Sequence, residues 1–222
     1  MAFARSAIVS VALLVAVASS IPVVSLAAAD SDVTDEIAAT GATGATGEVI
    51  TIANEGGALE GHTPTAFAGM STGLFAGDNL NPSFPEGVGV QTYLTFFLPP
   101  ELDVSSAQIV SDALRVSGTP FEDLGPLLAE PVVYESFGPE LFDLAAIGPP
   151  TECTVTSETS IQCDATDALV AADAEGMAAA QFRIRFEVPA DNDGSQDLAM
   201  FFRTDSNTNE AGLFELVISQ NP

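Results

Sequence analysis

The chain has 222 residues, with 31 Asp and Glu against only 5 Arg and no Lys, and its formal net charge is −26. A field of this sign repels nucleic acid and anionic membrane surfaces, which excludes both classes of partner. Charged residues make up only 16% of the chain, so the imbalance comes from missing Lys. It indicates either a surface suited to a salt-rich medium, where charges are screened, or compositional drift in an exported protein.

Residues 1–29 have the pattern of a secretory signal peptide. Arg5 precedes an apolar run over residues 7–18, and small residues at 26–29 precede Asp30. The run is shorter than the about 20 apolar residues of a transmembrane helix; an uncleaved membrane anchor is the alternative. The pattern predicts a secreted protein, extracellular, periplasmic or at the cell surface, with no membrane insertion after cleavage.

Residues 30–48 predict a flexible leader. They are small and polar, and Ala-Thr-Gly occurs twice, at 42–44 and 45–47. Such a composition cannot bury enough apolar surface to order itself. The remaining residues, 49–222, are enough for one β-sandwich domain with its own core.

The remainder of the chain predicts an all-β fold, an antiparallel β-sandwich of the jelly-roll-like kind. Short β-rich runs alternate with clusters of Gly, Pro, Asn and Asp, as expected of a sandwich. The strongest early strand covers residues 89–98 and ends at Pro99, which cannot donate to a strand ladder. Further strands are expected at residues 107–116, 131–134, 153–163 (two strands), 181–188, 198–202 and 213–218.

The segment 181–188 has the cleanest strand alternation in the chain. Because successive side chains of a strand point to opposite faces, one set should enter the core and the other should face solvent. The expected core set is Phe182, Ile184, Phe186 and Val188, and the expected solvent set is Gln181, Arg183, Arg185 and Glu187.

One short helix is predicted at residues 164–175. Thr166 or Asp167 is the expected N-cap, because a short oxygen-bearing side chain can accept from the first free N–H groups. Gly176 is the expected stop, since glycine adopts the left-handed conformation that ends helices.

Cys153 and Cys163 are predicted to form a disulfide across a hairpin. A turn near Glu158 pairs residues whose numbers sum to 316, so Val155 opposes Ile161 and the two cysteines oppose each other. Directly opposed Cα atoms lie about 4.5 to 5.5 Å apart, within reach of a disulfide. Closing this loop contributes about 3 kcal/mol, and the bond fits an oxidising compartment.

An acidic segment at residues 190–197 predicts a calcium site. It offers the carboxylates of Asp191, Asp193 and Asp197, the Asn192 amide, and Gly194 where the backbone must turn. Calcium takes six to eight oxygen ligands of these kinds. The alternative is a polar hairpin turn, because Asn-Asp-Gly favours turns by itself. Residues 77–79 and 205–210 are two further oxygen-rich turns.

The order of segments resembles DNRLRE domains, secreted β-sandwich modules grouped with carbohydrate-binding modules. The resemblance rests on residues 93–99, 106–109 and 163–170 and covers about residues 70 to 220. It implies a jelly-roll-like sandwich with a surface or matrix role, and it carries over no binding residue. Thr95 and Phe97 depart from the family's usual Arg and Asp, and the chain has no Trp.

The leading functional prediction is a secreted, non-catalytic module with a structural, adhesion or surface-binding role, stabilised by Ca²⁺. Its expected partner is an extracellular polysaccharide or a surface or matrix protein. A carbohydrate-binding protein is the first alternative, with its site beside Tyr134 or at the calcium loop. Tyr93 is expected in the core, and without Trp the usual aromatic platform for sugars is missing.

A secreted glycan-active hydrolase is the second alternative. It requires two carboxylates about 5 to 9.5 Å apart in a cleft. Ser71, in the segment 69–73, matches the pattern of a nucleophile elbow. That motif needs a His later in the chain, whereas the single His, His62, comes earlier, so Ser71 is expected to be a turn serine.

Overall fold

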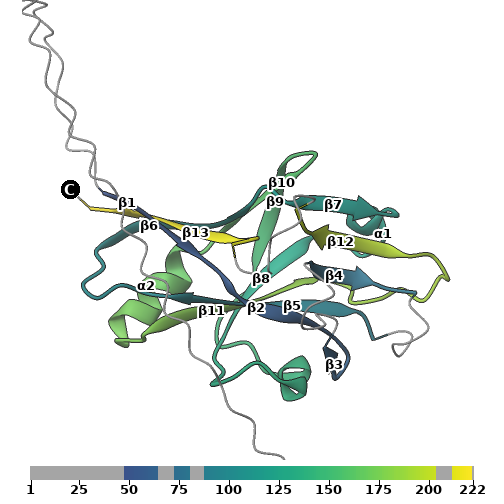
Figure 1. Cartoon of the computed structure of the whole chain (residues 1–222), viewed down its shortest axis with the longest axis horizontal. Helices are drawn as coiled ribbons and strands as arrows, with labels where there is room; N and C mark the ends of the chain where they lie inside the picture. The colour runs from purple at the N-terminus through teal and green to yellow at the C-terminus, as the bar shows by residue number, and fades with distance from the viewer. Residues whose placement is uncertain (1–47, 65–72, 81–87, 204–211, 222) are drawn as a thin grey trace, which may run out of the picture. The chain divides into compact units, whose positions relative to one another are not determined.

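The computed structural model describes residues 48–64, 73–80, 88–203 and 212–221 (Figure 1). Chain contacts divide the sequence into Met1–Thr43 and Gly44–Pro222, and every described residue lies in the second unit. The predicted signal peptide, the leader up to residue 47, Ser71 and the turn at 205–210 lie outside the described residues. Within the described ranges, no helix has the length and apolar character needed to cross a membrane.

The fold is all-β and antiparallel, as predicted, with few helices. The strands are β1 (Val49–Ala53), β2 (Glu55–Glu60), β3 (Thr63–Pro64), β4 (Leu74–Asp78), β5 (Val90–Phe97), β6 (Val104–Ser111), β7 (Leu114–Ser117), β8 (Leu127–Val132), β9 (Thr151–Ser157), β10 (Ser160–Asp164), β11 (Ala179–Phe186), β12 (Asp197–Phe201) and β13 (Glu215–Gln220). The helices are α1 (Pro120–Asp123), the 3₁₀ helix η1 (Pro139–Asp143) and α2 (Thr166–Ala174).

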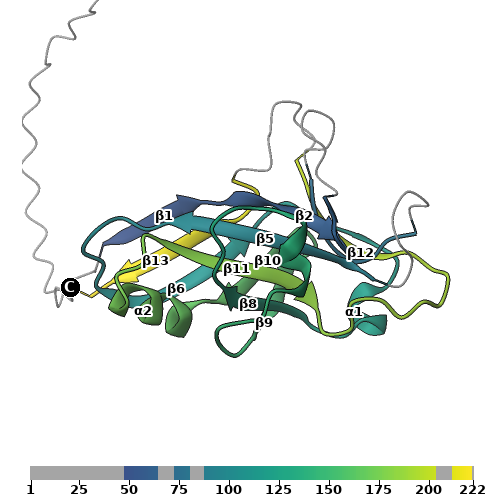
Figure 2. The same cartoon turned by 90° about the horizontal axis from the view of Figure 1, so that it is seen from below.

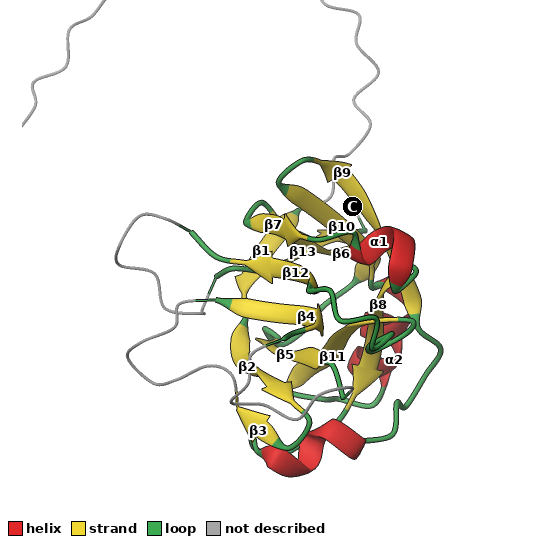
Figure 3. Ribbon diagram, turned by 90° about the vertical axis from the view of Figure 1, so that its right-hand side faces the viewer, coloured by secondary structure: helices red, strands yellow, loops and turns green. Residues whose placement is uncertain are grey.

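The strands form two layers that join along one side. One layer runs β1-β13-β6-β10-β9, and the other contains β8, β11 and β5, then β4, β12 and β7, with β2 also paired to β5. Two residue pairs between β8 and β9 connect the layers, so the sheet curls around the core (Figure 3). Figures 1 and 2 both place α2 at one end of the sheets and α1 at the other.

The core lies between the inward faces of the two layers. Phe182, Ile184 and Phe186 of β11 are buried there, as the alternation predicts. Val188 is 39% exposed, so its predicted place in the core is wrong. The strand ends at Phe186, and beyond that point the alternation no longer determines which way a side chain faces.

The cysteine hairpin has the predicted register. Cys153 pairs with Cys163 and Val155 pairs with Ile161, and the two cysteines form a disulfide with their Cα atoms 4.2 Å apart. Both cysteines are buried, so the disulfide joins β9 to β10 within the core. This confirms the disulfide prediction from sequence.

The prediction that Arg183 and Arg185 face solvent is wrong. Arg183 is buried, Arg185 is half-buried, and Glu130 of β8 lies between them. Arg183 Nε donates to Glu130 Oε2 at 2.7 Å, and Arg185 Nη2 donates to Oε1 at 2.5 Å. The connection between β8 and β9 covers this sheet face, since the Leu144 carbonyl also accepts from Arg183.

Several predicted boundaries are also wrong. The strand expected at 107–116 is two strands, β6 in one layer and β7 in the other, because the chain changes layers at residues 112–113. The strand expected at 131–134 lies earlier, as β8. The N-cap of α2 is Ala165, because Thr166 Oγ1 instead accepts from the Ala107 N–H. Gly176 does end this helix region, with φ of +67°.

Candidate metal centre

The acidic loop between β11 and β12 brings its three aspartates together. One carboxylate oxygen from each of Asp191, Asp193 and Asp197 lies within 4.8 Å of the others. The Asp191 carboxylate accepts from the Asp193 N–H, and the Asp193 carboxylate accepts from the Ser195 N–H at 2.6 Å. These short-range hydrogen bonds hold two carboxylates in place on a loop that is otherwise exposed to solvent.

Asp197 is the buried member of this cluster. It begins β12 and is only 1% exposed. Its Oδ1 accepts from the Thr119 N–H at 2.6 Å, just before α1, and its Oδ2 has no hydrogen-bond partner. Gly118 has φ of +73°, and a Cβ atom there would lie 2.3 Å from Asp197 Oδ1, so only glycine lets this loop approach the carboxylate.

Asp78, at the end of β4, is a buried acidic neighbour of the cluster. It pairs directly with Asp197 across the β4–β12 ladder and is 3% exposed. Its Oδ2 also lacks a hydrogen-bond partner. Burial raises the pKa of Asp78, and so do the negative charges of Asp191, Asp197 and Asp193, while a hydrogen bond from the Asn192 backbone lowers it.

Two residues paired across the β4–β12 ladder therefore each bury a carboxylate oxygen that has no hydrogen-bond partner. Among the buried side-chain oxygen and nitrogen atoms of the described residues, Asp78 Oδ2 and Asp197 Oδ2 alone have no hydrogen-bond partner. Burying a charged group without compensation is strongly unfavourable. A cation held by the loop carboxylates would offset this concentration of negative charge.

The three loop carboxylates lie close enough together to share one cation. Calcium binds oxygen at about 2.3 to 2.6 Å, so two oxygens on one ion lie at most about 5 Å apart. The spacing of the loop carboxylates meets this limit.

The structure therefore brings together Asp191, Asp193 and Asp197 as the sequence predicts, and it places the buried Asp78 near enough for their charges to raise its pKa. Asn192 lies in the same loop with φ of +59°, and its backbone N–H reaches Asp78; a role for its side-chain amide stays a prediction. The sequence signal for Asp78 was the oxygen-rich turn at 77–79. Only the pairing of β4 with β12 shows that this turn meets the acidic loop.

A buried glutamate stands next to this cluster. Glu60 at the end of β2 is 1% exposed, and its Oε2 accepts from Asn79 Nδ2 at 2.9 Å. The pKa of Glu60 is raised from 4.5 to about 7. Burial is the main cause and the charge of Asp78 adds to the rise, while the hydrogen bond from Asn79 opposes it. Negative charge at Glu60 and Asp78 is thus mutually unfavourable.

Tyr134, the predicted ligand-binding aromatic, is half-buried rather than exposed. Its hydroxyl lies 2.8 Å from Thr95 Oγ1, and its ring meets Tyr93 edge-on. Tyr93 is fully buried, as expected. Tyr134 also borders a hollow of about 400 Å³ that includes Phe97 and Phe137.

His62, the histidine considered for catalysis, lies in an exposed contact with Asp143. His62 Nε2 and Asp143 Oδ2 form an exposed pair 2.8 Å apart. A second hollow, of about 530 Å³, has Asp164, Asp167 and Glu175 among its lining residues. Hydrogen bonds from Thr166 lower the pKa of Asp164, the opposite of what a general acid needs at neutral pH. The hydrolase alternative stays an untested prediction.

Comparisons with known proteins identify no family. The chain matches none of the protein-family models, and no curated protein matches it. The resemblance to DNRLRE domains therefore stays a prediction, and functional inference rests on the site itself.

Proposed function

We propose that the protein is a secreted, non-catalytic β-sandwich module with a structural or surface-binding role, stabilised by Ca²⁺ between β4 and the β11–β12 loop. The proposal rests on one observation: Asp78 Oδ2 and Asp197 Oδ2 are buried next to Asp191 and Asp193 and have no hydrogen-bond partner. A bound divalent cation would neutralise this cluster and tie together β4, β12 and the loop. Extracellular calcium is abundant enough to fill even a weak site, with Kd of about 10⁻⁴ to 10⁻³ M.

Secretion is supported by two independent features. The signal-peptide pattern of residues 1–29 predicts export, and the Cys153–Cys163 disulfide fits an oxidising compartment. Sequencing the N-terminus of the protein from culture medium checks this part. We expect it to begin at Asp30; an intact N-terminus in the cytoplasmic fraction would contradict it.

Calorimetric titration with calcium tests the proposed function directly. Protein freed of metal by EDTA and desalting should take up about one calcium ion per chain at constant ionic strength. Asp78→Asn and Asp197→Asn should abolish the binding, while Asp173→Asn, an exposed change on α2, should leave it intact. No saturable binding up to about 10 mM calcium, well above the weak-site range, would refute the proposal. Equal loss in all three variants would refute it too.

A second candidate function is carbohydrate binding, and the hollow beside Tyr134 favours it. Phe97 is 57% exposed and Phe137 is 37% exposed, and both border this hollow. Aromatic rings beside a hollow offer apolar contact to the faces of a sugar. Pull-down with insoluble polysaccharides tests it: Phe97→Ala should reduce binding, and Val188→Ala, another exposed apolar residue, should not.

A further inference from the structure

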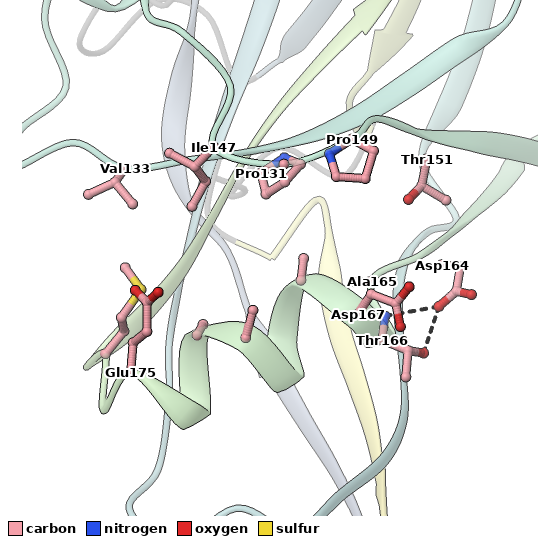
Figure 4. Close-up of a pocket in the computed structure, with 15 residues that line it drawn as sticks. Pro131, Val133, Ile147, Pro149, Thr151, Asp164, Ala165, Thr166, Asp167 and Glu175 are labelled. Atoms are coloured by element: carbon pink, nitrogen blue, oxygen red, sulfur yellow. Dashed lines mark hydrogen bonds between the residues drawn. The ribbon is translucent and has the colours of Figure 1, made fainter.

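The second hollow lies at the opposite end of the sheets from the metal centre. Its volume is about 530 Å³, within the range of small-molecule sites. Figure 4 shows α2 forming one side and the segment from Pro131 to Thr151, with Val133 and Ile147, forming the other. The hollow is thus built from two segments that the fold brings together, and it is independent of the proposed calcium site.

The walls of this hollow are mainly apolar. Ile147 is 62% exposed and Val133 is 43% exposed, and both line the hollow. On the helix side, Ala168, Ala171 and Ala172 leave room because their side chains are short. Apolar groups left exposed around a concavity favour a ligand with an apolar body.

The charge around the hollow has one sign. Asp164, Asp167 and Glu175 border it, and no Arg or His is among the described residues that line it. Asp164 already accepts from the N–H and hydroxyl of Thr166, and both it and Asp167 lie at the positive N-terminal end of α2. Their negative charge is therefore partly compensated.

Glu175 stands at the other end of the helix, where the helix dipole disfavours a negative charge. It follows the last turn of α2, which contains no basic residue, so its charge adds to the negative end of the helix dipole. In Figure 4 its carboxylate points from the helix end toward the side of the hollow where Val133 and Ile147 lie. At this end of α2, a negative potential therefore lies next to the apolar wall formed by Val133 and Ile147.

We propose that this hollow binds an amphipathic organic cation, with its ammonium group at Glu175 and its apolar body between Ala171 and the Val133–Ile147 wall. The chemistry is that of a primary or quaternary ammonium attached to a short alkyl or aromatic group. A ligand of equal shape without the positive charge gains only the apolar contacts, and an anionic one is repelled.

Titrations followed by NMR chemical shifts test the proposal in the purified protein. The probes are hexyltrimethylammonium, hexanol, hexanoate and tetramethylammonium at constant ionic strength. We expect saturable binding of hexyltrimethylammonium, with shifts at α2 and residues 147–151, at least about fivefold tighter than hexanol. Hexanoate and tetramethylammonium should not saturate. Equal binding of hexanol and hexyltrimethylammonium, or no saturation by either, would overturn the proposal.

Two matched pairs of variants separate the hollow from the general attraction of an acidic protein for cations. Ala171→Leu fills the hollow and should abolish binding, whereas Ala174→Leu, an exposed change on the same helix outside the hollow, should preserve it. Glu175→Gln should weaken binding about threefold to fivefold, and Asp173→Asn should not weaken it. Equal effects within either pair would overturn the proposal, and circular dichroism confirms that each variant is folded.

Discussion

Asp78→Asn should have opposite effects on stability with and without calcium. In EDTA the wild-type protein holds Asp78 and Asp197 as buried neighbours on paired strands. At about 5 Å, the usual spacing of directly opposed strand residues, two like charges repel by about 3 kcal/mol at an effective dielectric constant of about 20. Asparagine removes this repulsion and can still accept from the Asn192 N–H.

The size of both effects follows from the fold. Burial and neighbouring negative charge raise the pKa of Asp78, so we expect the relief to be smaller than the full repulsion. We expect the variant to gain about 1 to 2 kcal/mol in EDTA, a rise in Tm of about 3–6 °C for a domain of this size. In calcium at 100 times Kd, the wild-type protein gains about 2.7 kcal/mol, or about 5–10 °C.

The assay is thermal unfolding by circular dichroism in EDTA and in calcium at matched ionic strength, with magnesium as a second control. The variant should melt above the wild-type protein in EDTA and show no calcium-specific shift. Asp173→Asn should show the full wild-type calcium shift. A lower Tm of Asp78→Asn in EDTA would refute the reasoning, because it would mean that the charged Asp78 stabilises the metal-free fold.

Three further predictions concern stability. Since the pKa of Glu60 is about 7 in the folded state and 4.5 when unburied, the folded protein keeps a proton that the unfolded chain releases. The free energy of unfolding in EDTA should therefore fall by about 3 kcal/mol from pH 4.5 to 7 and level off above. Urea unfolding of Glu60→Gln should show that this part of the fall is gone. A pH profile of the variant that matches the wild-type profile would contradict the prediction. Burial disfavours the Glu130 carboxylate, but its hydrogen bonds with Arg185 and Arg183 lower its pKa. Glu130→Gln leaves two buried or half-buried guanidinium groups without a counter-charge, so we expect a loss of about 3 kcal/mol in urea unfolding at pH 7. The control is Asp112→Asn, which breaks the exposed pair with Arg203 and should lower the unfolding free energy by less than about 1 kcal/mol. Similar losses for Glu130→Gln and Asp112→Asn would count against a stabilising role of the buried ion pairs. Replacing Cys153 and Cys163 together by Ser should lower unfolding free energy by about 3 kcal/mol, and reductant should lower the wild-type protein equally; a reductant effect on the double variant would show that the loss has another origin.

The sequence alone predicted the geometry wherever the interacting residues lie close along the chain. The Cys153–Cys163 hairpin, the buried face of Phe182, Ile184 and Phe186, and the convergence of Asp191 with Asp193 all follow from turn chemistry and strand periodicity within about ten residues. Over such distances few chain conformations compete, so the pattern of neighbouring residues determines the geometry. The all-β class follows from the same kind of signal.

Only the tertiary structure decided which distant segments meet. Periodicity assigned Arg183 and Arg185 to solvent, but the chain between β8 and β9 covers that face, and Glu130 lies between them. Likewise, the turn at Asp78 had no visible link to the acidic loop until β4 paired with β12. Strand pairing over long separations depends on the packing of the whole core against loop-closure entropy. For that reason the sequence indicated an acidic loop and one face of a sheet, while the fold placed the buried Asp78 opposite Asp197 and formed the acidic hollow beside α2.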